Sequence, residues 1–157
     1  MTSRDRGPST RGSRAGPIDA TLTGRATGAR VVAVTTTVDS FFDEYARRYT
    51  ERDVEGVTNL CLWPFHAVRR GVAIHMSDRD AVRDHLAGEI AAYRFAGTAT
   101  WTPVEIETRQ LGDDSVFATV HWNALDADGA IVRDTWTSYQ LLATPDGWRF
   151  LSYTNHF

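Results

Sequence analysis

The period of the apolar residues changes near residue 97, and this change limits the possible folds more than any other feature of the chain. Before this point apolar side chains recur every three or four residues, which is typical of amphipathic helices. After it they alternate with polar ones in four runs separated by turn residues. A chain that forms helices first and a strand meander afterwards is expected to gather its helices on one face of an antiparallel sheet.

The first two helices are predicted from their caps and their apolar spacing. The first begins after Thr36 or Thr37, and its inward face consists of Val38, Phe41, Phe42, Tyr45 and Tyr49. Asp53 is expected to cap a short second helix, because aspartate side chains accept the exposed amide hydrogens of a first turn. The Trp63-Pro64-Phe65 segment should end this helix.

The remaining elements are a short strand pair, a third helix and the meander. The strand pair is expected near residues 65–69 and 72–75, and a capping box at Ser77 should start a helix that stops near Gly97. Asp-Gly pairs suit the tight turns between the later strands. The meander strands are predicted at residues 99–110, 115–125, 131–142 and 148–155. The sequence therefore predicts an α+β fold.

The amino-terminal segment differs in composition from the rest. Residues 1–34 are rich in Arg, Gly, Ser and Thr and contain few large apolar side chains, so we expect a disordered tail, with one folded domain over residues 35–157. Residues 1–30 hold six basic and two acidic residues, which leaves two alternatives, an arm that binds an anionic surface or nucleic acid and an inert tail. The net charge of −3 argues against nucleic acid as the main partner.

Several classes of protein are excluded or disfavoured by what the sequence lacks. A single cysteine, Cys61, cannot form an intrachain disulfide or a cysteine-rich zinc site. No apolar run reaches the roughly 18 residues of a membrane helix, so we expect a cytoplasmic protein that does not enter membranes. The histidines show no metal-ligand spacing, and no glycine-rich phosphate loop is present. We therefore expect neither a metal nor a cofactor.

Several segments together resemble the nuclear transport factor 2-like superfamily. They are Phe41-Phe42-x-x-Tyr45, Asp53-x-x-Gly56-Val57, Trp122, Tyr139 and Asp146-Gly147-Trp148-Arg149-Phe150. Within the superfamily, residues 35–157 look like the stand-alone SnoaL-like and ketosteroid-isomerase-like domains. The resemblance implies a cone-shaped, cystatin-like roll, in which a curved sheet wraps around three helices and leaves a central pocket. The fold does not fix the activity, because it hosts isomerases, dehydratases, cyclases, epoxide hydrolases and plain binding domains.

The resemblance also indicates where catalytic residues would lie. Tyr45 and Tyr139 fall at the positions of the two groups that hold an oxyanion in the isomerase branch. Arg69 falls at or near the position of the general-base carboxylate, so this chain departs from the isomerase pattern there. His66 is the nearest residue able to act as a base. The candidate catalytic residues are therefore Tyr45, His66 and Tyr139.

Three further residues are predicted to bind the ligand. Trp122 should line the pocket, His156 should lie at its rim, and Arg69 either enters as an anion anchor or stays at a solvated edge. The function that these residues favour is a cofactor-independent isomerase, dehydratase or cyclase acting on a compact, mostly apolar, oxygen-bearing molecule. The alternatives are a ligand-binding domain without chemistry and a dimeric interaction module.

The alternation of two predicted strands also suggests a partner. If Trp122 and Tyr139 face the helices, then Phe117 and Trp136 face away from them. Exposed aromatic patches on a sheet usually mark an interface, so a homodimer through the outer sheet face is expected. The alternative is that the tail or the twist of the sheet covers these two side chains.

Overall fold

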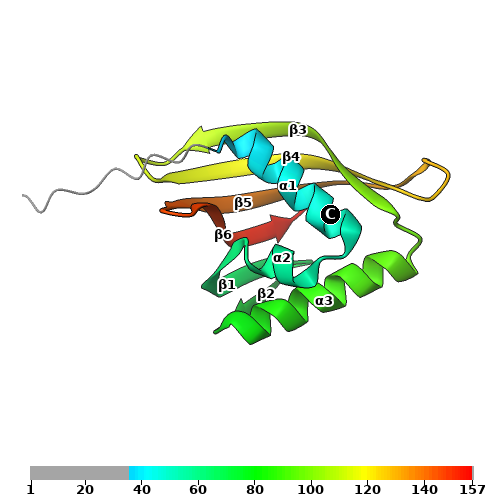
Figure 1. Cartoon of the computed structure of the whole chain (residues 1–157), viewed down its shortest axis with the longest axis horizontal. Helices are drawn as coiled ribbons and strands as arrows, with labels where there is room; N and C mark the ends of the chain where they lie inside the picture. Colours follow the sequence, from blue (N-terminus) through cyan, green and yellow to red (C-terminus); the bar gives the residue numbers. More distant parts are fainter. Residues whose placement is uncertain (1–35, 157) are drawn as a thin grey trace, which may run out of the picture.

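A computed structural model of the chain describes residues 36–156, in which three helices lie on one face of a six-stranded sheet (Figure 1). The tail predicted for residues 1–34 lies outside the described residues. The elements, in chain order, are α1 (Val38–Glu51), α2 (Val54–Thr58), β1 (Cys61–Arg69), β2 (Val72–Met76), α3 (Arg79–Phe95), β3 (Thr100–Gln110), β4 (Ser115–Leu125), β5 (Ile131–Thr144) and β6 (Gly147–Asn155). Among residues 36–156, no helix has both the length and the apolar character required to cross a bilayer.

Each helix begins at a side-chain cap. Thr37, Asp53 and Asp78 accept hydrogen bonds from the backbone amides three residues later, at 3.2, 2.8 and 3.0 Å. The third cap is Asp78 and not Ser77, whose hydroxyl donates to the Asp78 carboxylate at 2.8 Å. A carboxylate at this position also interacts favourably with the positive end of the helix dipole.

The sheet has the order β2-β1-β6-β5-β4-β3. The predicted meander is present in strands β3 to β6, and β1 pairs with β2 as an antiparallel hairpin. The sheet is nevertheless mixed, because β1 lies parallel to β6. Strand β1 also starts at Cys61, so the Trp63-Pro64-Phe65 segment lies inside a strand and does not merely end the helix. The α+β fold with a curved, unclosed sheet around three helices is confirmed.

The core lies between α1 and the inner face of the sheet, which is the face turned toward the helices. Phe42 is fully buried at its centre, with its ring 5.1 Å from that of Tyr139 and 5.7 Å from that of Phe150. Strand β4 supplies alternate residues to this layer, namely Val116, Ala118, Val120 and Trp122, all buried. The sequence alternation therefore fixes which side chains face the helices.

The outer face of the sheet, turned away from the helices, carries the other half of the alternation. Phe117 lies there with 42% of its surface exposed. The Trp136 ring stacks on that of His121 at 4.6 Å with an interplanar angle of 7°. Both predicted outward residues thus lie on the same face, as the strand period requires.

Removing the central ring should destabilise the domain far more than removing an exposed one. We expect Phe42→Ala to lower the free energy of unfolding by about 3–5 kcal/mol, because it deletes a buried ring and leaves a cavity. Phe95→Ala is the matched control, since Phe95 is 95% exposed, and should change stability by less than about 0.5 kcal/mol. Urea unfolding followed by circular dichroism measures both, and equal losses would contradict this description of the core.

Candidate functional site

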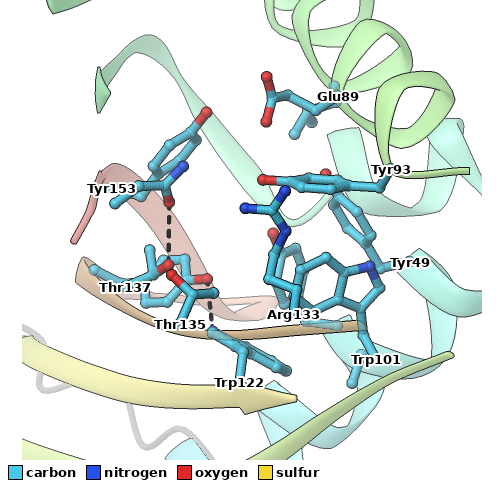
Figure 2. A pocket seen from close by; sticks show the side chains of 14 residues that line it. Tyr49, Glu89, Tyr93, Trp101, Trp122, Arg133, Thr135, Thr137 and Tyr153 are labelled. Atoms are coloured by element: carbon cyan, nitrogen blue, oxygen red, sulfur yellow. Dashed lines mark hydrogen bonds between the residues drawn. The ribbon is translucent and has the colours of Figure 1, made fainter. Parts of the chain in front are cut away.

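A cavity opens between the helices and the inner face of the sheet (Figure 2). Its empty volume is about 600 Å³ with the open mouth included, and residues from α1, α3 and strands β3 to β6 line it. Helix α3 therefore covers one wall of the cavity while the sheet forms the opposite wall.

Tyrosine is concentrated in this cavity. All five tyrosines of the chain line it, and no phenylalanine of residues 36–156 does. The two residue types differ only by a hydroxyl group, and a buried hydroxyl is costly unless it has a hydrogen-bond partner. The phenol oxygens of the chain are therefore gathered around this cavity. The five residues are Tyr45, Tyr49, Tyr93, Tyr139 and Tyr153.

The deep end of the cavity holds two of the tyrosines predicted from the sequence. The hydroxyl of Tyr139 accepts a hydrogen bond of 3.1 Å from the indole nitrogen of Trp122, and the Tyr45 ring lies 6.1 Å from the Tyr139 ring. Burial raises the pKa of Tyr45 well above its ordinary value of 10.0. Burial also raises the pKa of Tyr139, although hydrogen bonds with Trp122 and its neighbours oppose this rise. Both groups are therefore neutral donors at neutral pH.

A histidine that the sequence reasoning did not select lies beside the cavity wall. The Nε2 atom of His85 is 2.6 Å from the hydroxyl oxygen of Tyr153, and Tyr153 lines the cavity. Burial lowers the pKa of His85, with the nearby Glu89 opposing this shift and Arg69 adding to it. Burial likewise raises the pKa of Tyr153. At neutral pH a neutral imidazole therefore meets a neutral phenol.

The mouth of the cavity carries charged groups. Glu89 of α3 lines the cavity, and its carboxylate forms an ion pair with Arg69 of β1. Arg133 of β5 also lines the cavity, with its guanidinium carbon 5.2 Å from the centre of the Tyr93 ring. Arg69, a candidate ligand-binding residue, does not line the cavity itself. It forms an ion pair with Glu89, which does.

The structure brings three of the six predicted site residues together at the cavity. Tyr45, Trp122 and Tyr139 all line it. His66 lies on the outer face of β1, because Phe65 and Ala67 on either side of it take the buried positions. Its Nε2 atom is 2.9 Å from the Nδ1 atom of His75 on the neighbouring strand.

His156 is also directed away from the cavity. Its Nε2 atom lies 2.9 Å from the hydroxyl of Ser138, which alternates with the cavity residues Thr137 and Tyr139 along β5. The preceding residue, Asn155, takes the inward position and bonds Thr137 at 3.0 Å. The inward position at the end of β6 therefore belongs to Asn155, one residue before the predicted His156.

The described part of the chain has no cluster suited to metal binding. Among residues 36–156, no group of three or more His, Cys, Asp or Glu side chains converges on one point. Burial raises the pKa of the Cys61 thiol to about 12, and its sulfur lies 3.7 Å from the Val57 carbonyl oxygen. Burial therefore disfavours the thiolate form, which is the reactive one.

Comparison with solved structures finds the same fold in several proteins. An NTF2-like protein with a cystatin-like fold from Novosphingobium aromaticivorans superposes with a TM-score of 0.59 at 18% identity, over 74% of this chain and 76% of that one. A candidate dehydratase of the NTF2-like family from Streptomyces avermitilis gives 0.59 at 20% identity, over 75% and 91%. A candidate ketosteroid isomerase from Shewanella frigidimarina gives 0.59 at 16% identity, over 79% and 98%. At these identities the likeness shows the fold alone.

Sequence comparison adds the family. A search of curated proteins finds no significant match to the chain. Residues 35–157 match the family model described as NTF2-like protein (DUF6841), which covers most of the chain. The cone-shaped fold, the central cavity and this match agree, and the chain belongs to the NTF2-like family.

Proposed function

We propose that this domain binds a small, mostly apolar, oxygen-bearing molecule in the cavity and catalyses a proton transfer on it, as in an isomerisation. The observation that carries the proposal is the cavity lined by every tyrosine of the chain, one of which is hydrogen-bonded to a neutral histidine. Related folds named as a candidate dehydratase and a candidate ketosteroid isomerase are consistent with it.

The first task of the cavity is to hold a ligand oxygen. Tyr45 and Tyr139 remain protonated because burial raises the pKa of both, so each can donate to a carbonyl or enolate oxygen. The bond from Trp122 to the Tyr139 oxygen makes the Tyr139 hydroxyl a better donor, since linked hydrogen bonds polarise one another. A single donor directed at developing negative charge is worth on the order of 10² to 10³ in rate.

The second task is to move a proton, and Tyr153 with His85 can do this. The Tyr153 oxygen takes a proton from a ligand carbon while its own proton passes to Nε2 of His85, 2.6 Å away. The imidazolium then returns a proton by the same route to another atom of the ligand, so that no net charge changes. Because the pKa of His85 is lowered, its imidazolium gives the proton back readily. Tyr153 is the catalytic residue here, and His85 is a positioning residue that acts through it.

Hydrogen exchange on an acidic ketone tests this function without a known substrate. We expect the wild-type domain to accelerate exchange of the α-hydrogens of 2-tetralone in D₂O, followed by proton NMR. Tyr153→Phe should slow the catalysed exchange by about a hundredfold, because the phenol oxygen carries the proton. His85→Gln should slow it as well, whereas the matched control His66→Gln should leave it unchanged, since His66 lies on the outer face.

The pH profile separates a proton-moving histidine from a merely structural one. Acidification protonates His85 only below its ordinary pKa of 6.5, because burial lowers the pKa of the folded protein. The rate of catalysed exchange should therefore stay constant as the pH is lowered to 6.5 and decrease at lower pH. The residual exchange rate of His85→Gln should not show this decrease. Bound 2-tetralone without accelerated exchange would instead favour the alternative, a ligand-binding domain without chemistry.

We also propose that the domain forms a homodimer through the outer face of the sheet. Phe117 is 42% exposed there, and Trp136 lies on the same face with the His121 ring stacked on it. Large aromatic side chains at the centre of an interface usually contribute most of its free energy. A dimeric interaction module without ligand chemistry remains the alternative for this surface.

Replacing an aromatic residue on this face by a charged one should separate the subunits. We expect Trp136→Arg to elute as a monomer from a sizing column at micromolar concentration, where the wild type elutes as a dimer. Trp63→Arg is the matched control, because Trp63 is 49% exposed but lies on β1, which β6 separates from β5 in the sheet. This variant should remain dimeric. A monomeric wild type would contradict the proposal.

A further inference from the structure

We infer that the ligand of the cavity is an organic acid, in which an apolar ring enters the deep end and a carboxylate binds Arg133 at the mouth. The inference rests on the proposed function, because it names the chemical class of ligand for the same cavity. It begins from an asymmetry between the two charged residues that line the cavity, Glu89 and Arg133.

The sheet directs Arg133 into the cavity. Arg133 pairs in register with Ala124, which is fully buried on the inner face of β4. The next residue, Asp134, points to the outer face, where its carboxylate lies 2.7 Å from His121. Figure 2 shows the guanidinium of Arg133 beneath the Tyr93 ring. The ring attracts the guanidinium through its π electrons and fixes its direction without neutralising its charge.

Arg133 has no acidic partner within residues 36–156. No carboxylate of this part of the chain lies within ion-pair distance of its guanidinium, although the side chain is partly buried. The acid that shares the cavity, Glu89, is already paired with Arg69. A partly desolvated cation without a counter-charge is costly, and a bound anion removes this cost. The flat fork of a guanidinium fits a carboxylate with two parallel hydrogen bonds.

A second donor lines the same cavity. The Oδ1 atom of Asn155 accepts the hydroxyl of Thr137 at 3.0 Å. This bond orients the amide so that its Nδ2 hydrogens bond no acceptor among residues 36–156 and are free for a ligand. A carboxylate at Arg133 therefore has a neutral donor within the same cavity lining.

The rest of the cavity fits a flat, apolar body. Trp101 and Trp122 lie edge to face with ring centres 6.3 Å apart, and Leu86 of α3 lines the cavity with them. Aromatic walls of this kind favour aromatic or alicyclic rings over open chains, because rings match their edge and face geometry. The ligand class is thus a carboxylic acid with one or two rings.

A pair of probes of equal shape tests the charge requirement. Isothermal titration calorimetry with 2-naphthoate and with its neutral amide, 2-naphthamide, compares ligands that differ in charge at one end. We expect the wild type to bind the acid at least about tenfold more tightly, since hydrogen bonds to charged groups are the stronger ones. In Arg133→Gln this preference should disappear through weaker binding of the acid, while binding of the amide stays within about twofold.

The control is Arg109→Gln, which removes the same charge from an exposed position of β3 and should keep the wild-type preference. Equal affinity of the wild type for acid and amide would overturn the inference, but it would not contradict the proposed small-molecule site. Binding of neither probe at millimolar concentration would contradict the proposed small-molecule site as well. A third probe, 2-naphthyl phosphate, must bind more weakly than the acid, and tighter binding would reassign Arg133 to phosphate.

Discussion

Phenol groups that leave water must find hydrogen-bond partners, and the arrangement of helices and sheet around the cavity depends on this need. At the deep end, the indole of Trp122 donates to Tyr139. At the α3 wall, the imidazole of His85 bonds Tyr153. Each of these contacts joins two elements or two strands, so the same bonds that satisfy the hydroxyls also hold the walls of the cavity in place. What the protein leaves unsatisfied is available to a ligand.

The charged groups are arranged around the same cavity. Arg69 of β1 reaches across to Glu89 of α3 and neutralises the acid of the cavity. Arg133 of β5 is then the cavity cation that forms no ion pair within residues 36–156. A cavity that is aromatic at one end and cationic at the other suits a molecule that is apolar at one end and anionic at the other. The separation also keeps charge away from Tyr45 and Tyr139, whose raised pKa values depend on an apolar surrounding.

Most of the fold could be predicted from local patterns, because the caps at Thr37 and Asp53 and the alternation of β4 and β5 are encoded within a few residues. The same patterns placed Tyr45, Trp122 and Tyr139 on inward faces. The parallel pairing of β1 with β6 could not be predicted in this way, because it joins segments that are about half the chain apart. Long-range pairing depends on how the whole sheet closes around the helices.

Which histidine lies beside the cavity could not be predicted for a similar reason. His66 was selected by its distance along the chain from a family position, but the residues beside it, Phe65 and Ala67, carry the inward alternation. A signal for His85 was present, since it precedes the inward Leu86 and stands one helical turn before Glu89. Spacing on a helix shows which residues share a face. It does not show what that face contacts, and the contact of His85 is Tyr153 on the last strand.

The five tryptophans of the chain allow the central claim, that this cavity is the ligand site, to be tested directly. Two of them, Trp101 and Trp122, line the cavity, and Trp63, Trp136 and Trp148 do not. The measurement is a ¹⁵N–¹H NMR titration of the five indole N–H signals with 2-naphthoate. The account predicts that the Trp101 and Trp122 signals shift in a saturable manner while the other three stay in place. Shifts confined to Trp63 or Trp136, with the cavity signals unmoved, would contradict it.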